Sequence, residues 1–204
     1  MSAEAAVHVV DDDAAVRDSL RWLLESVGLS VNLYDSAQAF MAKSPDLMCG
    51  CVLLDVRLRD MSGLQLQRVL RDNGFWLPIL FITGHGDVEM AVQAMKEGAA
   101  DFFTKPLDEQ RLLDSVQSAL AQSRHQQEQR LQQMLASQRL TLLTPRERQV
   151  LERVSAGQLN KVIADDLHIS IKTVEVHRGR IMEKMQAGTL AELLRRIALT
   201  NTPD

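Results

Sequence analysis

The stretch GCVLLDVRLRDMSG, residues 50–63, decides the fold of the first half of the chain. Its apolar run from Val52 to Leu54 is typical of a strand buried on both faces of a parallel sheet. Asp55 follows at the point where that strand should leave the sheet. In an open α/β sheet, the carboxyl ends of the strands face the crevice that binds ligands. A charge there requires a partner, so Asp55 indicates a chemical site.

Four more apolar runs flank this stretch, and segments with helical spacing of apolar residues separate them. The predicted strands are 6–10, 30–33, 50–54, 78–82 and 101–104. Ser36, Ser62 and Asp108 are predicted N-caps of three of the following helices, and another helix is predicted to begin at about Asp87. This alternation predicts an α/β, doubly wound, five-stranded parallel sheet.

The flavodoxin-like strand order 2-1-3-4-5 is common for such a sheet, and it makes the first and third strands neighbours. Asp11 and Asp12 would then lie beside Asp55. Three carboxylates at this distance either raise one another's pKa values or hold a divalent cation, and Mg²⁺ suits oxygen ligands shared with a phosphate. Thr83 and Lys105 end the next two strands and would add a hydroxyl and an ammonium. The set predicts a phosphoryl-transfer site with Asp55 as nucleophile.

Four motifs make residues 6–120 resemble the receiver domain of two-component response regulators. They are VVDD (9–12), LLD (53–55), ITG (82–84) and KP (105–106). The resemblance implies that Asp55 accepts a phosphoryl group from the phosphohistidine of a cognate sensor histidine kinase. It also implies a Mg²⁺ site in which Asp12, Asp55 and the backbone carbonyl of Arg57 bind the ion, while Asp11 acts through water.

The same resemblance implies roles for the remaining residues of the crevice. Thr83 and Lys105 would hydrogen-bond the phosphoryl oxygens, and Phe102 would turn inward as Thr83 moves. The Lys105–Pro106 peptide bond would be cis. One position departs from the family pattern, because Arg59 stands where related sequences usually have proline.

Two histidines and two cysteines need separate interpretation. His8 lies inside the first predicted strand and is interpreted as a packed side chain. His85 follows Thr83 by two residues, where it could influence the access of water to a phosphoryl group. Cys49 and Cys51 have neither zinc nor redox spacing, so we interpret them as small apolar residues in a reducing compartment.

Charge divides the chain into an acidic front and a mildly basic back. Residues 1–121 carry 18 acidic and 10 basic side chains, net −8, whereas residues 141–204 carry 8 and 10, net +2. The back part could therefore approach a polyanion. No secretory signal and no apolar run of membrane-spanning length is found, so a cytoplasmic protein without membrane contact is expected.

The predicted organisation is a receiver domain at 1–121, a helical linker at 122–140 and a DNA-binding domain at 141–204. The linker continues the last receiver helix, because neither proline nor glycine occurs between residues 107 and 144. One helix of roughly thirty residues is predicted from this run of helix formers. Seven glutamines in residues 122–138 leave a frayed linker open as the alternative.

The last segment has the start signals of several short helices. Thr144, Pro145 and Glu147 form a predicted capping box with proline at the first helical position. A second helix opens at Asn160, and Ser170 caps a third after a short turn, which is a helix-turn-helix arrangement. Thr189 and Glu192 are predicted to form another capping box at a fourth helix.

This segment resembles the LuxR-type four-helix DNA-binding domain through LTPRERQVL (143–151), NKVIADDL (160–167) and SIKTVEVHRGRIMEKM (170–185). The resemblance implies that the third helix enters the major groove, with Glu175, Val176 and Gly179 facing the bases. Four polar residues, Lys172, Thr173, Arg178 and Lys184, would lie nearer the phosphates. The full set of candidate DNA-binding residues is Lys172, Thr173, Glu175, Val176, His177, Arg178, Gly179, Arg180 and Lys184.

Both halves together are closest to the FixJ-like activators among response regulators of the FixJ/NarL type. The expected function is phosphorylation-controlled DNA binding at a promoter, as a homodimer formed on phosphorylation and with RNA polymerase as a further partner. The surface of the fourth helix, fifth strand and fifth helix would become the dimer interface or release the DNA-binding helices. Apart from its own phosphorylation and slow dephosphorylation, the chain is not expected to be an enzyme.

The sequence bears on two other functions. A haloacid-dehalogenase-like hydrolase needs an acid two residues after its nucleophile, where this chain has Arg57, and is rejected. The alternative that stays open is a phosphorylation-independent DNA-binding regulator whose receiver is only a dimerisation platform.

Overall fold

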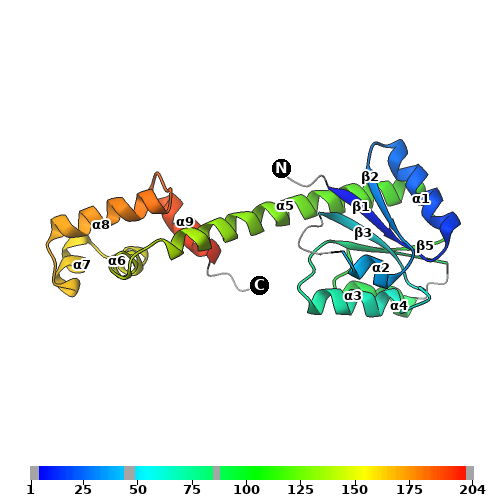
Figure 1. Cartoon of the computed structure of the whole chain (residues 1–204), viewed down its shortest axis with the longest axis horizontal. Helices are drawn as coiled ribbons and strands as arrows, with labels where there is room; N and C mark the ends of the chain where they lie inside the picture. Colours follow the sequence, from blue (N-terminus) through cyan, green and yellow to red (C-terminus); the bar gives the residue numbers. More distant parts are fainter. Residues whose placement is uncertain (1–4, 44–48, 85–87, 201–204) are drawn as a thin grey trace. The chain divides into compact units, whose positions relative to one another are not determined.

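The computed structural model describes residues 5–43, 49–84 and 88–200. The chain divides into two compact units, Met1–Gln127 and Glu128–Asp204. Each unit has its own hydrophobic core and is described separately (Figure 1). No helix within the described ranges is long and apolar enough to cross a membrane.

A five-stranded parallel sheet forms the centre of the first unit. Its strands are β1 (Ala6–Val10), β2 (Ser30–Tyr34), β3 (Gly50–Asp55), β4 (Ile79–Thr83) and β5 (Asp101–Thr104). Their spatial order is β2-β1-β3-β4-β5, which confirms the predicted doubly wound topology. All six residues of β3 are buried, as expected for a central strand covered on both faces.

Helices cover both faces of this sheet (Figure 1). They are α1 (Ala14–Ser26), α2 (Ala37–Met41), α3 (Gly63–Asp72), α4 (Val88–Lys96) and α5 (Glu109–Thr141). Val52 and Leu54 of β3 pack with residues of α2, α3 and α4, whereas Cys51 and Leu53 pack with α1 and α5. The alternation of side chains along one strand thus supplies two separate apolar cores.

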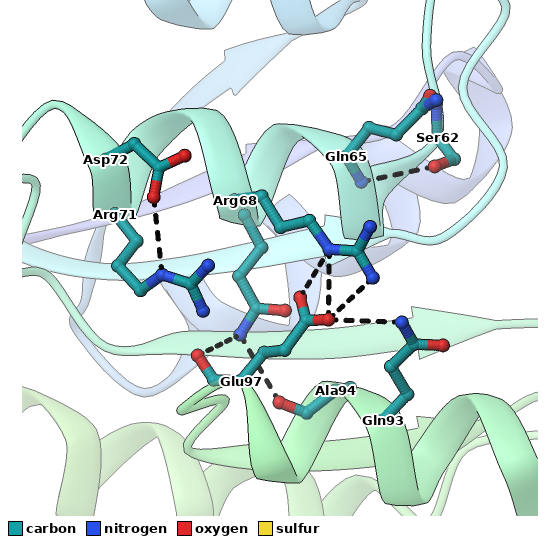
Figure 2. A network of polar contacts seen from close by, with 9 residues as sticks. Ser62, Gln65, Arg68, Arg71, Asp72, Gln93, Ala94 and Glu97 are labelled. Carbon is teal, nitrogen blue, oxygen red and sulfur yellow. Dashed lines mark hydrogen bonds and ion pairs between the residues drawn. The ribbon is translucent and has the colours of Figure 1, made fainter.

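Capping side chains hold the loops that lead from the strands into the helices. Asp13 accepts from the Ala15 backbone N–H at 2.9 Å, and Asp108 accepts from Arg111 N–H at 3.1 Å. Ser62 and Gln65 form a reciprocal capping box at the start of α3, seen at the upper right of Figure 2. These bonds satisfy amides that a helix leaves without partners in its first turn.

A polar network fastens α3 to the C-terminal end of α4 (Figure 2). The buried Gln67 donates from Nε2 to the carbonyl oxygens of Ala94 and Glu97, at 3.4 and 3.3 Å. Arg68 donates to both carboxylate oxygens of Glu97, with its shortest contact, from Nη2 to Oε1, at 2.7 Å. A bidentate pair and two carbonyl contacts resist sliding of one helix on the other.

Helix α5 is continuous over 33 residues, which confirms the predicted long helix. Its buried Ser123 lies beyond the predicted receiver boundary at residue 121, yet its hydroxyl accepts from Gly50 N–H of β3 at 3.2 Å. Gly50 is required at that position, because a Cβ there would lie 1.7 Å from the Ala6 carbonyl oxygen.

Local features of the sheet agree with several sequence interpretations. His8 is buried, with Nδ1 3.3 Å from the Tyr34 hydroxyl, so it is a packed side chain as predicted. Cys49 and Cys51 are buried free thiols, and burial raises the pKa of Cys51 to about 12, which keeps it protonated and unreactive. The Lys105–Pro106 bond is cis, as expected.

Four helices build the second unit together with the end of α5. They are α6 (Pro145–Ser155), α7 (Asn160–Leu167), α8 (Ile171–Lys184) and α9 (Leu190–Thr200). The capping box of Thr144 and Glu147 is present, and Ser170 caps α8 as predicted. Between α7 and α8 the chain turns at His168, whose φ of 52° is left-handed.

Some element boundaries differ from the sequence predictions. Strands β2, β3 and β4 each end one residue later, at Tyr34, Asp55 and Thr83, because parallel pairing continues to these positions. The predicted α4 start at about Asp87 lies outside the described residues. Only one of the two hydrogen bonds of the predicted capping box at α9 is formed. The Thr189 hydroxyl accepts from Glu192 N–H as predicted, but the Glu192 carboxylate accepts from Gly188 N–H and not from Thr189 N–H.

One ion pair connects the first and third helices of the second unit. The buried Glu147 carboxylate accepts from Lys184 Nζ at 2.7 Å and from Thr144 N–H at 2.8 Å. Burial opposes ionisation of Glu147, but the hydrogen bonds from Lys184 and Thr144 outweigh it and lower the pKa of this carboxyl. The pair therefore holds α6 against α8.

We predict that Glu147→Gln lowers the free energy of unfolding of the second unit by about 1–2 kcal/mol at pH 7, because a buried carboxylate partner is lost while Lys184 can turn to water. The loss should shrink as the pH falls through the lowered pKa of Glu147, since protonation removes the same charge. Both tryptophans, Trp22 and Trp76, lie in the first unit. In a denaturant titration, the unfolding midpoint of the second unit, followed by circular dichroism, should therefore shift. The midpoint followed by tryptophan fluorescence should stay unchanged.

The control is Glu152→Ala, which removes an equal charge from an exposed position of the same helix. It should change stability by less than about 0.5 kcal/mol. Equal effects of the two substitutions would contradict a structural role of the buried pair.

Candidate functional site

The carboxyl ends of four neighbouring strands meet at one edge of the sheet. Asp55 is the last residue of β3, Thr83 is the last residue of β4, and both are buried. Asp11 follows β1 directly and is also buried, and Lys105 follows β5. The parallel topology thus gathers the side chains that the sequence predicted would share a crevice.

Lys105 connects the two buried carboxylates. Its Nζ lies 3.1 Å from Asp11 Oδ2 and 3.6 Å from Asp55 Oδ1. The lysine is positioned by its own backbone, because its N–H donates to the Thr83 carbonyl at 2.8 Å. Each carboxylate also accepts a hydrogen bond from a backbone amide. Asp13 N–H donates to Asp11 at 2.8 Å, and Arg57 N–H donates to Asp55 at 2.7 Å.

The Asp55 carboxyl is electrostatically strained. Burial raises its pKa most, and the nearby Asp11 charge raises it further. The Arg57 N–H and the Lys105 ammonium act in the opposite direction but do not compensate fully. Ionised Asp55 therefore favours any additional cation that reaches the site.

Asp12 has a different environment from Asp11. Its Oδ2 lies 2.9 Å from Nε of Arg59, in the loop after β3. Within the described ranges, no three acidic, histidine or cysteine side chains are already gathered as a metal cage. Mg²⁺ nevertheless fits these residues, because it typically uses one or two carboxylates and completes its shell with water and phosphate oxygens.

The residues with predicted switching or gating roles are placed as follows. Thr83 is buried, and Phe102 is half-buried with its ring centroid 6.1 Å from that of Phe81. Phe102 packs against the core formed by α2, α3 and α4. His85 lies outside the described residues, so its proposed influence on water access stays a prediction.

An apolar groove adjoins the carboxylate site, and sequence reasoning did not find it. The groove measures about 810 Å³ and lies between α1 and the β5–α5 loop, with Trp22, Leu23, Lys105, Pro106 and Leu107 among its lining residues. Trp22 is 75% exposed. The available signal in the sequence was the place of this large aromatic residue off the face of α1 that carries the buried Leu20 and Leu24.

In the second unit, α8 presents a continuous exposed face. The exposed residues at helical spacing are Lys172, Glu175, Val176, Gly179 and Arg180. Positions four and seven residues apart share one side of a helix, so this face can be presented to a groove as a whole. Gly179 leaves its centre free of side chains.

Three of the other DNA-binding candidates make polar contacts within the unit. Arg178 Nη1 donates to Asn160 Oδ1 at 3.0 Å, which ties α8 to the start of α7. Lys184 pairs with the buried Glu147, Thr173 Oγ1 lies 2.8 Å from Ser170 Oγ, and His177 is half-buried. Charge in the sequence could not distinguish these structural contacts from contacts with phosphate.

Comparison with known families assigns both units. Residues 7–117 match the family described as response regulator receiver domain, and residues 141–197 match the bacterial regulatory proteins of the luxR family. Receiver domains normally bind Mg²⁺ at their acidic pocket and imply a histidine kinase partner, and a luxR-family domain implies DNA binding.

Relatives extend over nearly the whole chain. The transcriptional regulatory protein FixJ of Bradyrhizobium diazoefficiens is 45% identical over 96% of this chain and 95% of its own length. The solved structure of the response regulator StyR has a TM-score of 0.86 and 42% identity, covering 96% of this chain and 99% of that one. A beryllofluoride-activated NtrC4 receiver domain dimer has a TM-score of 0.54 and 30% identity over 58% of this chain and 98% of its own.

The strand-end site and the exposed helix face therefore belong to two domains that occur together in known relatives. The fold, the order of the two domains and the similarity over the full length agree. The chain belongs to the response regulators of the FixJ/NarL type, transcriptional regulators that join a receiver domain to a LuxR-type DNA-binding domain.

Proposed function

We propose that Asp55 accepts a phosphoryl group from a cognate sensor histidine kinase and that this modification controls binding to promoter DNA. The observation that carries the proposal is the buried Asp55, held beside Asp11 by the shared Lys105 ammonium. An Asp55 oxygen attacks phosphorus, an O–P bond forms and the P–N bond to histidine breaks. The leaving imidazole nitrogen keeps the bonding electron pair and takes a proton from solvent.

In this proposal Asp12, Asp55 and the Arg57 carbonyl would hold Mg²⁺, and Asp11 would act through water. When bound, the ion neutralises negative charge on the phosphoryl oxygens and the carboxylates. Lys105 and the Thr83 hydroxyl hydrogen-bond the phosphoryl oxygens. Thr83 ends β4, the neighbour of β3, and the Lys105 ammonium already lies 3.6 Å from Asp55 Oδ1.

Phosphorylation adds a charge of about −1.5 to −2 at a site already rich in carboxylates. Thr83 then moves toward the phosphoryl group and Phe102 turns inward, which changes the surface of α4, β5 and α5. That surface forms a homodimer or releases the DNA-binding helices, and the dimer acts with RNA polymerase in the cytoplasm. The relative solved as an activated receiver dimer supports the dimer. Beyond its own phosphorylation and slow dephosphorylation, the chain catalyses nothing in this proposal.

We predict that wild-type protein with beryllofluoride and Mg²⁺ sediments as a dimer and binds promoter DNA at least tenfold more tightly than without them. Asp55→Asn should stay monomeric and weakly binding in both conditions, because it lacks the oxygen that receives the phosphoryl group. Sedimentation measures the oligomeric state, and a DNA-binding titration measures the affinity. Equal dimerisation and binding in all four samples would instead favour the alternative, a phosphorylation-independent regulator.

The apolar groove beside Lys105 is where we propose that the kinase docks, because a donor seated there reaches the Asp55 edge of the sheet. Trp22→Ala should lower kcat/KM for phosphotransfer from the sensor kinase at least tenfold, since a buried tryptophan at an interface centre is worth about 2 kcal/mol or more. Phosphorylation by acetyl phosphate, which needs no docking surface, should keep its rate.

The matched control is Val27→Ala, which truncates another exposed apolar residue at the far end of α1. It should leave both phosphodonors unaffected. If Trp22→Ala slowed acetyl phosphate as strongly as the kinase, the groove would be part of the phosphorylation site itself and not a docking surface.

Gly179 is proposed to let α8 approach the DNA closely. A Cβ at this position meets nothing within 4 Å in the unit, so internal packing does not require glycine. We predict that Gly179→Ala stabilises the second unit by about 0.5–1 kcal/mol, because glycine is a poor helix former, yet weakens DNA binding about fivefold. Gly179→Leu should weaken binding further. Thermal unfolding of Gly179→Ala should thus show a higher melting temperature, while DNA titration shows a lower affinity. Tighter DNA binding by this variant would contradict close approach of α8 to the DNA.

A further inference from the structure

The loop between β3 and α3 forms a tight reversal at the edge of the acidic site. Gly63 N–H donates to the Val56 carbonyl at 2.8 Å, and Arg57 and Ser62 form an antiparallel bridge. The residues between these contacts, Leu58 to Met61, are therefore carried on a closed loop. Arg59 lies within it, and its side chain is 84% exposed.

The residue after Arg59 anchors this loop to a separate element. Asp60 Oδ2 accepts from Gln38 N–H at 2.9 Å, and Oδ1 accepts from Ala37 N–H at 3.3 Å and from Met61 N–H at 3.1 Å. The first two amides belong to the first turn of α2. Although Asp60 is exposed, these bonds fix the backbone from which Arg59 extends.

The anchored arginine reaches the one acidic residue of the site that Lys105 does not contact within the described part of the chain. Arg59 Nε lies 2.9 Å from Asp12 Oδ2, and the Asp12 side chain is 24% exposed. Lys105 is shared by Asp11 and Asp55. Asp11, Asp12 and Asp55 are thus each paired with a lysine or arginine side chain of the protein in the absence of metal.

We propose that Arg59 competes with Mg²⁺ for the Asp12 carboxylate, so that it sets the Mg²⁺ concentration at which the site fills. This inference rests on the proposed Mg²⁺ site. Arginine and a divalent cation are both attracted by the same carboxylate, and they repel each other when both are near it. The Asp12 carboxylate must lose its contact with the Arg59 guanidinium before it can bind the metal ion. The Arg59 side chain then extends into solvent.

The test is a Mg²⁺ titration of the full-length protein by calorimetry, with the backbone amide shifts of residues 11–12 and 55–57 as a second readout. Arg59→Gln should bind Mg²⁺ roughly threefold more tightly than wild type, the size expected for loss of one exposed ion pair. The difference should decrease in about 1 M salt, where charges are screened beyond ~3 Å. Neither readout requires phosphorylation.

Two further variants separate the specific pair from a change in overall charge. Arg71→Gln removes the same charge from α3, where the arginine pairs with its neighbour Asp72, and should leave the affinity at the wild-type value. Asp60→Ala loosens the loop while keeping Arg59, and should shift the affinity in the same direction as Arg59→Gln. In an Asp12→Asn background, Arg59→Gln should have a smaller effect, because the contested carboxylate is gone.

The outcomes distinguish this inference from the proposal on which it rests. If wild type and Arg59→Gln bind Mg²⁺ equally, or if Arg71→Gln matches Arg59→Gln, the role of Arg59 is wrong while the Mg²⁺ site stands. If wild type shows no Mg²⁺-dependent amide shifts at residues 11–12 and 55–57 up to millimolar metal, the Mg²⁺ site itself is wrong and the inference falls with it.

Discussion

The interaction on which the first unit depends is the contact of one ammonium with two buried carboxylates. Parallel pairing of β1, β3, β4 and β5 forces Asp11, Asp55, Thr83 and Lys105 to one edge of the sheet. Two carboxylates buried this closely are unfavourable without a cation, because burial and mutual repulsion both oppose ionisation. Lys105 relieves this only in part, as the raised pKa of Asp55 shows. The fold therefore maintains a site that attracts further positive charge.

Most of this arrangement was predictable from the sequence, because it follows from patterns that act locally. Apolar runs define strands, and Ser62, Thr144 and Ser170 define helix starts through bonds within one turn. Once five strand and helix units were recognised, topology placed the strand ends together. The predicted ends of β2, β3 and β4 were wrong by one residue, whereas those of β1 and β5 were correct. Propensity does not show how far a ladder of hydrogen bonds continues into a polar residue.

Contacts that depend on loop geometry were not predictable in the same way. The pair of Arg59 with Asp12 joins residues 47 positions apart, and the anchor from Asp60 to α2 depends on where a short helix begins. In the second unit, Arg178 and Lys184 have the charge expected of phosphate contacts, yet their polar atoms bind Asn160 and Glu147. A cation in a sequence shows only that a partner is needed, and the fold decides whether that partner is internal.

The second unit also constrains how the proposed phosphorylation could act on DNA binding. Its helices have their own apolar core, their own caps and the internal Glu147–Lys184 pair. These helices are therefore packed and capped within the unit itself, so regulation need not act by folding or unfolding them. A single module of this size makes few specifying contacts with DNA, whereas two linked modules gain affinity from effective concentration without new contacts. Under the proposed function, a change in assembly is thus the simplest way in which one added charge at Asp55 could produce a large change in promoter occupancy.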